Sequence, residues 1–169
     1  MIGGGPAGFM AAITAAERGV RDVLILEATS EVLTKVRISG GGRCNVTHAC
    51  WDPLELVGHY PRGSRPLRGP FSRFACGDSI AWFDEHGLTL VEESDGRMFP
   101  QQNRSEAVVE CLRRAALATG VKIQCGSAVR HLNCSAAGDF QISDQRSAFY
   151  QAKRVLLASG GHPSGRRLA

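Results

Sequence analysis

Three glycines and a glutamate near the start of the chain have the spacing of a nucleotide-binding fingerprint. Gly3, Gly5 and Gly8 match the pattern G-x-G-x-x-G, and Glu27 follows Gly8 by about twenty residues. In such a fingerprint the first glycine allows a tight turn, the second admits a pyrophosphate against the backbone, and the third lets a helix pack closely on a strand. Free backbone N–H groups and the positive dipole end at the helix start would hold the phosphates. The expected phosphate-binding residues are Gly3, Gly5, Pro6, Ala7 and Gly8.

A helix and a buried strand must position these residues. Apolar residues recur every three or four positions between residues 6 and 18, which predicts a helix that ends at Gly19. The continuous apolar run VLIL at 23–26 predicts a strand buried on both faces. Glu27 ends this strand, where a carboxylate can accept hydrogen bonds from an adenosine ribose and disfavours a 2′-phosphate. The fingerprint therefore favours FAD or NAD over NADP.

A second glycine-rich stretch, ISGGGRCNVT at 38–47, has a cation and an amide at its exit. Three consecutive glycines can bring backbone N–H groups close to a flat cofactor and to phosphate. The alternative is a mobile surface turn, which the flanking apolar residues Ile38 and Val46 support poorly. A redox role for Cys44 beside the flavin would need a second cysteine within a few residues on the helix side to form a dithiol, and none lies that close. The expected cofactor-binding residues here are Gly41, Gly42, Arg43, Cys44 and Asn45.

This stretch resembles a motif of the BaiN/RdsA family of FAD-dependent oxidoreductases, which includes the aminoacetone oxidase-like flavoproteins. The family motif is G-R-K-L-x-x-S-G-x-G-R-C-N. The residues that match it are Lys35, Ser39, Gly40, Gly42, Arg43, Cys44 and Asn45, and those that differ are Leu33, Thr34 and Arg37. Residues 82–109 are similar to a second family block, W-F-E-x-x-G-L-x-L-x-x-E-x-x-G-R-x-F-P. The resemblance covers the chain apart from 49–70. It implies that FAD is the cofactor, that Lys35 contributes to its binding, and that NAD(P)H is a candidate electron donor.

The second half of the chain is predicted to contain two helices followed by a β-meander. Asp78 and Ser105 are the expected N-caps of helices that end at Gly87 and Gly120, with a short strand over 88–92 and a turn at 94–96 between them. The further strands are expected over 121–125, 128–132, 140–143 and 149–152. A basic run without acidic neighbours is predicted to be a solvated irregular loop, and its members are Arg62, Arg65, Arg68 and Arg73.

A meander that feeds a buried strand, here 155–158, is typical of glutathione reductase-like FAD domains. The following LLASGG resembles the A-T-G-G turn of such domains, which implies that Ser159, Gly160 and Gly161 lie beside the cofactor. Val129 stands where related domains contact adenine through the backbone. The expected fold class is therefore α/β: a glutathione reductase-like FAD-binding Rossmann fold, with a doubly wound parallel sheet and a three-stranded β-meander.

Composition and length exclude several classes of protein. The chain has 169 residues and a formal net charge of +4, a mild excess that does not indicate a nucleic-acid module. No run approaches the ~18 apolar residues of a membrane span, and no secretory leader precedes the fingerprint, so we expect a cytoplasmic protein without a membrane partner. The six cysteines and five histidines show no metal-ligand spacing, which predicts reduced thiols and no metal.

Both ends of the expected domain look cut. Only Met1 and Ile2 precede the fingerprint, and the chain ends at GGHPSGRRLA in what we interpret as the first turn of a further helix. Residues 1–169 are therefore expected to be the N-terminal part of one FAD/NAD(P)-binding domain. Its parts would be the fingerprint and GGGRCN loop (1–48), a helical and loop insertion (49–120), and the meander with its return strand (121–169). The 169 residues alone are expected to be poorly soluble and largely free of flavin.

The function expected from these features is that of an FAD-binding flavoprotein oxidoreductase with a small-molecule substrate. The flavin would carry the electron transfer, while the protein binds and orients it. No residue can be named as a catalytic acid or base. One alternative is a non-catalytic remnant of a nucleotide-binding protein, and the other is a flavoprotein that acts on tRNA.

Overall fold

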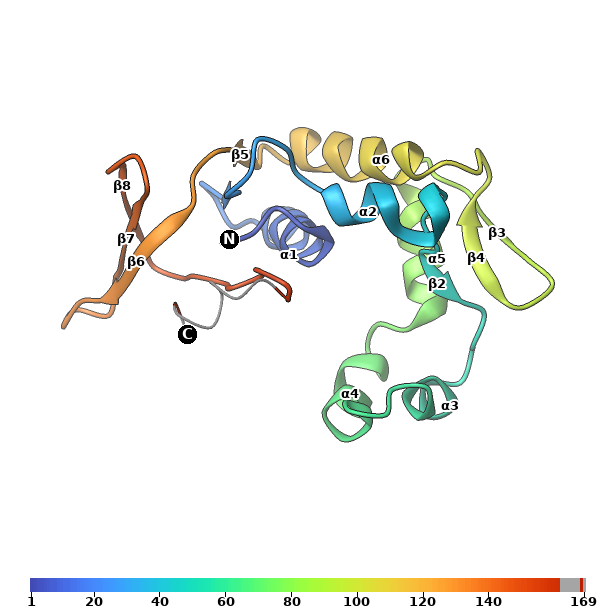
Figure 1. Cartoon of the computed structure of the whole chain (residues 1–169). Coiled ribbons are helices and arrows are strands. Elements are labelled where there is room, and N and C mark those ends of the chain that lie inside the picture. Colours follow the sequence, from blue (N-terminus) through green and yellow to red (C-terminus); the bar gives the residue numbers. More distant parts are fainter. Residues whose placement is uncertain (162–167, 169) are drawn as a thin grey trace. The chain divides into compact units, whose positions relative to one another are not determined.

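The computed structural model describes residues 1–161 and Leu168, which divide into two compact units. Unit 1 contains Met1–Val36 and Leu112–Ala169, and unit 2 contains Arg37–Cys111. The two boundaries between the units fall within helices α2 (Thr34–Ile38) and α6 (Ser105–Ala118). Both helices are labelled in Figure 1. The helix expected at the C-terminal end falls on residues 162–167 and 169, outside the described residues.

The helix and strand predicted around the fingerprint are confirmed in unit 1. Helix α1 (Pro6–Glu17) has proline at its first position, where the fixed φ suits a helix start, and ends before Gly19, whose φ is +86°. Its apolar face is fully buried at Phe9, Ala12 and Ile13. Strand β1 (Leu24–Leu26) pairs in parallel with β5 (Lys122–Gln124).

Ile2 lies between β1 and the segment that follows the meander. It forms parallel bridges to Leu26 and to Leu157, and its backbone N–H donates to the Leu156 carbonyl at 2.9 Å. Ile2 therefore lies between two parallel neighbours, one on each side. The buried strand predicted over 155–158 is wrong in extent, because its pairing is a single bridge and Leu156 is 43% exposed.

The three-stranded meander is confirmed. Strands β6 (Val129–Cys134), β7 (Phe140–Asp144) and β8 (Phe149–Ala152) pair antiparallel in that order, drawn in orange to red in Figure 1. The turn between β7 and β8 is held by the Asp144 carboxylate, which accepts the backbone N–H groups of Arg146 and Ala148, both at 2.9 Å. Burial would raise the pKa of Asp144, but the hydrogen bonds from Ala148 and Arg146 outweigh it and the pKa is lowered.

Unit 2 is built around a small antiparallel sheet in the order β2-β4-β3. The β3–β4 hairpin contains the predicted turn at 94–96, whereas β2 and β4 were not predicted. The basic run was predicted as an irregular loop, which is wrong for its middle: Arg65 and Arg68 lie in helix α4 (Ser64–Phe71), while Arg62 and Arg73 flank it, and all four are exposed as expected. The elements are the 3₁₀ turn η1 (Ser39–Gly42), β2 (Thr47–His48), α3 (Pro53–Gly58), α4 (Ser64–Phe71), α5 (Cys76–Glu85), β3 (Leu90–Glu92) and β4 (Arg97–Pro100).

Two helix-capping predictions in the second half of the chain are wrong in detail. Ala75 is the N-cap of α5, and Asp78 lies in the first turn, where its carboxylate accepts the Ala75 backbone N–H at 2.7 Å. Ser105 is the first residue of α6 rather than its cap, and its fully buried hydroxyl donates to the Arg37 carbonyl at 2.7 Å. Asp78 thus contributes to the cap of α5 from its first turn, whereas Ser105 joins the start of α6 to α2, 68 residues earlier in the chain.

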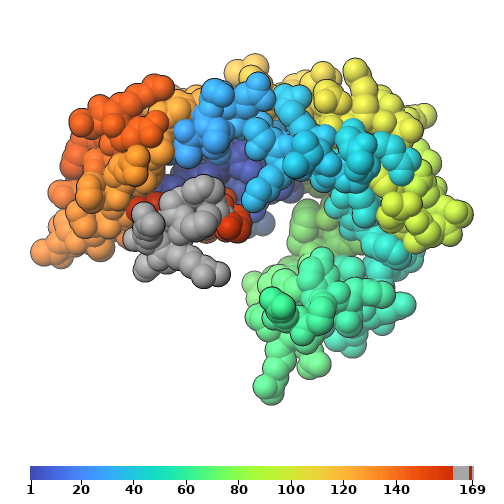
Figure 2. Space-filling model, in the orientation of Figure 1, coloured from blue at the N-terminus to red at the C-terminus, as the bar shows by residue number. Residues whose placement is uncertain are grey.

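Helices α3 and α4 pack against each other and form the lobe drawn in green in Figure 2. Two large apolar side chains in and beside α3 are exposed to solvent: Trp51 is 64% exposed and Leu54 is 69% exposed. The six cysteines are free thiols, as predicted, and four of them are buried. Among the described residues, no helix has both the length and the apolar character needed to cross a membrane.

Candidate dinucleotide-binding site

The three fingerprint glycines differ in what a methyl group added to each would meet. On Gly3, whose φ is +114°, the methyl group would overlap the Ala158 carbonyl, and on Gly8 it would overlap the Gly3 carbonyl. On Gly5 it would find nothing within 4 Å. The tight turn at Gly3 and the close approach of helix to strand at Gly8 are thus confirmed as requirements of the fold itself.

Gly5 is the N-cap of α1 and has an ordinary extended backbone, with φ −83° and ψ −179°. Neither conformation nor packing within the chain requires glycine at this position. No side chain caps α1, and its first turn carries no acidic residue, so its first backbone N–H groups keep their hydrogen-bonding capacity. Pro6 and Ala7 are exposed at this same helix end. The helix start beside Gly5 thus combines open space with uncapped backbone N–H groups, and helix N-termini of this kind favour negative charge.

The Glu27 carboxylate lies beside the fingerprint. Its Oε2 atom accepts the Gly4 backbone N–H at 2.7 Å, and its Oε1 atom accepts the backbone N–H and the hydroxyl of Thr29 at 2.8 and 2.9 Å. A methyl group on Gly4 would lie 2.8 Å from Val32 Cγ1 and 3.0 Å from the Glu27 carboxylate. The sequence pattern did not single out Gly4, since its position is unspecified in the motif. A carboxylate has about four lone-pair sites, so Glu27 keeps capacity for a further donor.

The residues after the meander lie close to the fingerprint and to α2. Ser159 N would be 3.1 Å from a methyl group on Gly3. Gly160 has φ +60°, and a methyl group on it would lie 3.7 Å from Lys35 Nζ. The structure therefore brings together Ser159 with Gly3 and Gly160 with Lys35, while Gly161 is exposed.

Val129 is half-buried at the start of β6. The segment just before it runs along Glu27, because the Ser127 backbone N–H donates to the Glu27 carbonyl at 2.8 Å. Gly126 continues this contact by donating to the Thr29 carbonyl at 2.7 Å. Val129 thus begins its strand two residues after a direct link to the acidic residue of the fingerprint.

The GGGRCN loop in unit 2 has a strongly left-handed backbone. Gly40, Gly41 and Gly42 have φ of +56°, +66° and +86°, and Cys44, although not a glycine, has φ +61°. A methyl group on Gly40 would lie 2.7 Å from Asn45 N, whereas on Gly41 or Gly42 it would find nothing within 4 Å. Burial raises the pKa of the Cys44 thiol, which keeps it protonated near neutral pH.

The side chains at the loop exit are engaged within unit 2. The Arg43 guanidinium donates to both carboxylate oxygens of Glu93, at 2.6 and 3.1 Å, and lies 3.8 Å from the centre of the Phe99 ring. The hydrogen bond from Arg43 lowers the pKa of Glu93. Asn45 Oδ1 accepts the Met98 backbone N–H at 3.2 Å. The cation and amide that we expected to meet a ligand thus bind the β3–β4 hairpin, and the loop presents its glycine backbone.

A parallel strand arrangement, a glycine turn into a helix and a carboxylate after the next strand define a Rossmann-type dinucleotide-binding domain. The chain belongs to the family described as the HI0933-like protein Rossmann domain, which matches residues 1–166. The predicted resemblance to the BaiN/RdsA family is thereby confirmed, as is the predicted fold class.

Two curated relatives are similar over nearly the whole chain. One is a 3-dehydro-bile acid delta(4,6)-reductase from Clostridium scindens, 33% identical over 165 residues, which are 97% of this chain and 39% of the relative. The other is a ribosomal RNA dihydrouridine synthase from Haemophilus influenzae, 27% identical over 164 residues, 95% of this chain and 39% of the relative. The chain therefore spans about two fifths of the length of these relatives.

Solved structures of the same fold include Thermovibrio ammonificans THI4, with a TM-score of 0.63 and 16% identity over 94% of this chain and 55% of that one. A 3-ketosteroid-delta4-(5alpha)-dehydrogenase from Rhodococcus jostii RHA1 has a TM-score of 0.62 and 17% identity over 90% of this chain and 43% of that one. At these identities the likeness establishes the Rossmann-like α/β fold.

Proposed function

We propose that this chain is the FAD-binding portion of a flavoprotein oxidoreductase that reduces an activated carbon–carbon double bond. The observation that carries the cofactor part of the proposal is the open backbone at Gly5, at an uncapped helix start beside the Glu27 carboxylate, and the reaction class is inferred from the names of two relatives. When bound, FAD would supply two-electron transfer to the substrate. NAD(P)H is the proposed electron donor.

The residues of unit 1 would bind the two halves of the dinucleotide differently. The first-turn N–H groups of α1 and its positive dipole end would hold the pyrophosphate against Gly5. Lys35, beside Gly160, would add a cation near the phosphates. The remaining lone pairs of Glu27 would accept the ribose hydroxyls of adenosine, and its charge would disfavour a 2′-phosphate.

The remaining predicted contacts are also proposals. The left-handed backbone of Gly41 and Gly42 would approach the flat ring of the cofactor, and Arg43 and Asn45 would position that loop through the β3–β4 hairpin. Val129 would contact adenine through its backbone.

The reaction class is supported by the names of two relatives. One is a delta(4,6)-reductase of a bile acid, and the other forms dihydrouridine, which contains two more hydrogens than uridine. Both names describe addition of hydrogen to a double bond that is conjugated or lies in an electron-poor ring. We infer the same class of reaction for this chain, with a small-molecule substrate.

Titration with FAD and FMN, followed by flavin fluorescence, tests the cofactor proposal. The titration uses a full-length version of the protein, because the 169 residues alone are expected to be poorly soluble and to bind little flavin. FMN lacks the adenosine that Glu27 would hold, so we expect tighter binding of FAD than of FMN. Glu27→Ala should weaken FAD binding by about 1–3 kcal/mol, the loss expected for a charged hydrogen-bond partner, and leave FMN binding unchanged.

The FMN arm is the internal control, because Glu27 also accepts the Gly4 N–H. If the variant only loosened the loop, both flavins would weaken together. Equal affinity of the wild-type chain for FAD and FMN would contradict the adenosine site.

A second candidate function is reduction of a base in RNA. The observation that favours it is the set of exposed arginines on and beside α4, Arg62, Arg65, Arg68 and Arg73, together with two relatives named as ribosomal RNA dihydrouridine synthases. The double variant Arg65→Glu with Arg68→Glu should weaken RNA binding. It should also reduce the slope of the binding constant against salt concentration, on logarithmic axes, by about two, because about two fewer counterions are released. The matched control is Arg18→Glu with Arg21→Glu, two exposed arginines of unit 1. Equal RNA binding by both double variants would remove α4 from this role.

A further inference from the structure

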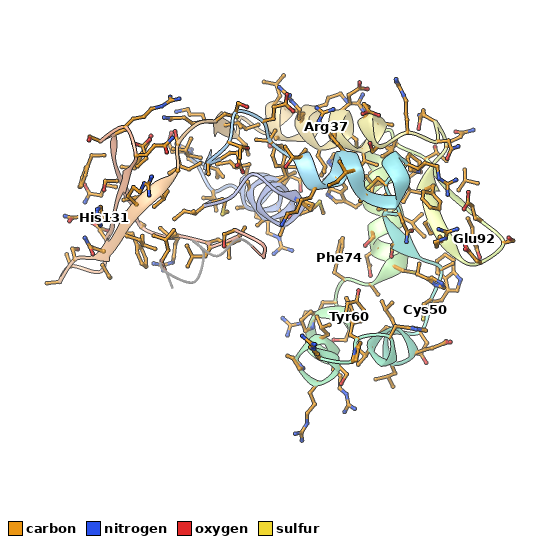
Figure 3. The ribbon with its side chains drawn as sticks, in the orientation of Figure 1. Arg37, Cys50, Tyr60, Phe74, Glu92 and His131 are labelled. Carbon is orange, nitrogen blue, oxygen red and sulfur yellow. The ribbon has the colours of Figure 1, made fainter. Side chains whose placement is uncertain are left out.

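Three side chains around α3 hold metal-ligating atoms close together. The Cys50 Sγ, a Glu55 carboxylate oxygen and a His59 ring nitrogen all lie within 4.8 Å of one another. Cys50 is buried, and Glu55 and His59 are exposed. All three belong to unit 2, on the segment from the end of β2 to the end of α3, where Figure 3 labels Cys50.

The local fold explains why these atoms converge. Glu55 and His59 are four residues apart, the spacing that puts two side chains on one face of a helix. Asp52 is the N-cap of α3, and its carboxylate accepts the Leu54 backbone N–H at 2.8 Å. This cap fixes the turn that leads back to Cys50, whose thiol lies 3.8 Å from the Asp52 carbonyl. The cluster is thus set by a capped helix start and one helix face.

A second contact orients the imidazole. The ring of His59 stacks on the ring of His48, with centroids 6.1 Å apart and an angle of 28° between the planes. His48 is in β2, so this contact links the end of α3 to the sheet of unit 2. Such an outer contact restricts the orientation of the ring, while the exposed side chain can still shift toward a metal ion.

The donor set matches a particular class of metal. Sulfur, imidazole nitrogen and carboxylate oxygen are the donors that Zn²⁺ takes in proteins, whereas Mg²⁺ and Ca²⁺ prefer oxygen alone. With ordinary zinc bond lengths of about 2.0–2.3 Å, tetrahedral donors lie about 3.5 Å apart, so the cluster needs to contract by about 1 Å. The exposed Glu55 and His59 side chains can make that movement while the buried thiol stays in place.

We propose that Cys50, Glu55 and His59 form a Zn²⁺ site with a fourth position for water or a small ligand. The site tethers the β2–α3 connection to the last turn of α3 and stabilises the α3–α4 lobe of unit 2. Sequence patterns predicted no metal, because they look for paired cysteines and histidines, and this site takes single residues of three types. The site is independent of the proposed flavin chemistry.

Titration of the reduced, tag-free 169-residue chain with Co²⁺ tests the site, since Co²⁺ reports its ligands by absorption. We expect one equivalent to bind with a thiolate-to-cobalt charge-transfer band and the d–d intensity of a tetrahedral site, and Zn²⁺ to displace it. Cys50→Ser should abolish the charge-transfer band. His59→Gln should weaken binding at least tenfold while the band remains. The matched control is Cys134→Ser, which removes an exposed thiol in the meander and should change neither signal.

Absence of the charge-transfer band in the wild-type chain, or its persistence in Cys50→Ser, would overturn the proposal. Because Cys50 is buried, its variant is checked for folding by circular dichroism. If the Cys50→Ser variant is unfolded, the test rests on the His59→Gln and Glu55→Gln variants, whose side chains are exposed. Unchanged Co²⁺ affinity in both His59→Gln and Glu55→Gln would overturn the site.

Discussion

The two glycine-rich loops, one in each unit, use glycine for different reasons. In the fingerprint of unit 1, the chain's own backbone fills the space beside Gly3 and Gly8 and leaves the space beside Gly5 open. In the GGGRCN loop of unit 2, open space lies beside Gly41 and Gly42, but both have a left-handed backbone. Gly5 alone among these combines open space with an ordinary backbone. The fold itself gives no reason for glycine at Gly5, which agrees with the proposed pyrophosphate contact, whereas at Gly41 and Gly42 the left-handed turn is a sufficient reason.

The charged side chains beside the two loops differ in the same way. Glu27 accepts three donors from the loop residues Gly4 and Thr29 and keeps room for a further donor. Arg43 gives two hydrogen bonds to Glu93 and a third to Asn103. Glu27 thus keeps hydrogen-bonding capacity for the proposed ribose contact, while Arg43 holds its loop to the β3–β4 hairpin.

Within the fingerprint, the largest expected effect is the loss of stability in Gly8→Ala. The added methyl group would overlap the Gly3 carbonyl, and overpacking of this kind costs about 3 kcal/mol when backbone must move. Alanine is more favourable than glycine in a helix interior by about 1 kcal/mol. A net loss in the free energy of unfolding would therefore come from the overlap with the Gly3 carbonyl. Urea unfolding measures it, with Gly5→Ala as the matched control and an expected change within about 1 kcal/mol. Equal unfolding midpoints for the two variants would remove the distinction between these glycines.

A second comparison concerns the loop of unit 2. Alanine at either Gly40 or Gly41 adopts a left-handed backbone, at a cost of about 1–2 kcal/mol. Only at Gly40 does the methyl group also press on Asn45 N, 2.7 Å away, so Gly40→Ala should lose about 1–3 kcal/mol more than Gly41→Ala. Urea unfolding of both variants gives the difference. Equal losses of unfolding free energy in Gly40→Ala and Gly41→Ala would show that the close approach at Gly40 does not affect stability.

The smallest effect is a pH dependence at the Arg43–Glu93 pair. Arg43 lowers the pKa of Glu93 in the folded state, so the pair stabilises the fold above the unfolded pKa of about 4.3. That contribution is lost as pH falls through the lowered folded pKa. Arg43→Gln should therefore lose less stability than the wild-type chain between about pH 5 and about pH 3. Unfolding midpoints across this range measure the effect, and parallel curves for the two proteins would contradict it.

Sequence predicted those parts of the fold that have local signals. Helix α1 has an apolar period, a proline at its start and Gly19 after its end, and the meander has alternating strands with glycine and aspartate turns. Strands β2 and β4 were missed because β2 is two residues long and its partner Met98 is about fifty residues away. Helix α4 was missed because it contains Pro70 and buries no residue.

The candidate site was predictable to the same extent. Spacing identified the positions of Gly3 and Gly8, and the structure shows the contacts that require them. It gave no signal for the Arg43–Glu93 pair, because fifty residues separate its members. The cluster of Cys50 with Glu55 and His59 is local, but its three residue types match no established metal motif.

The measurement that tests the central claim most directly is FAD binding by Gly5→Val. A Cβ atom added at Gly5 meets nothing within 4 Å, so the variant should unfold near the wild-type urea midpoint. Its side chain would stand between the helix start and the pyrophosphate, so fluorescence titration should detect no FAD binding where the wild-type chain saturates. A folded Gly5→Val protein that binds FAD as tightly as the wild-type chain would contradict the dinucleotide site.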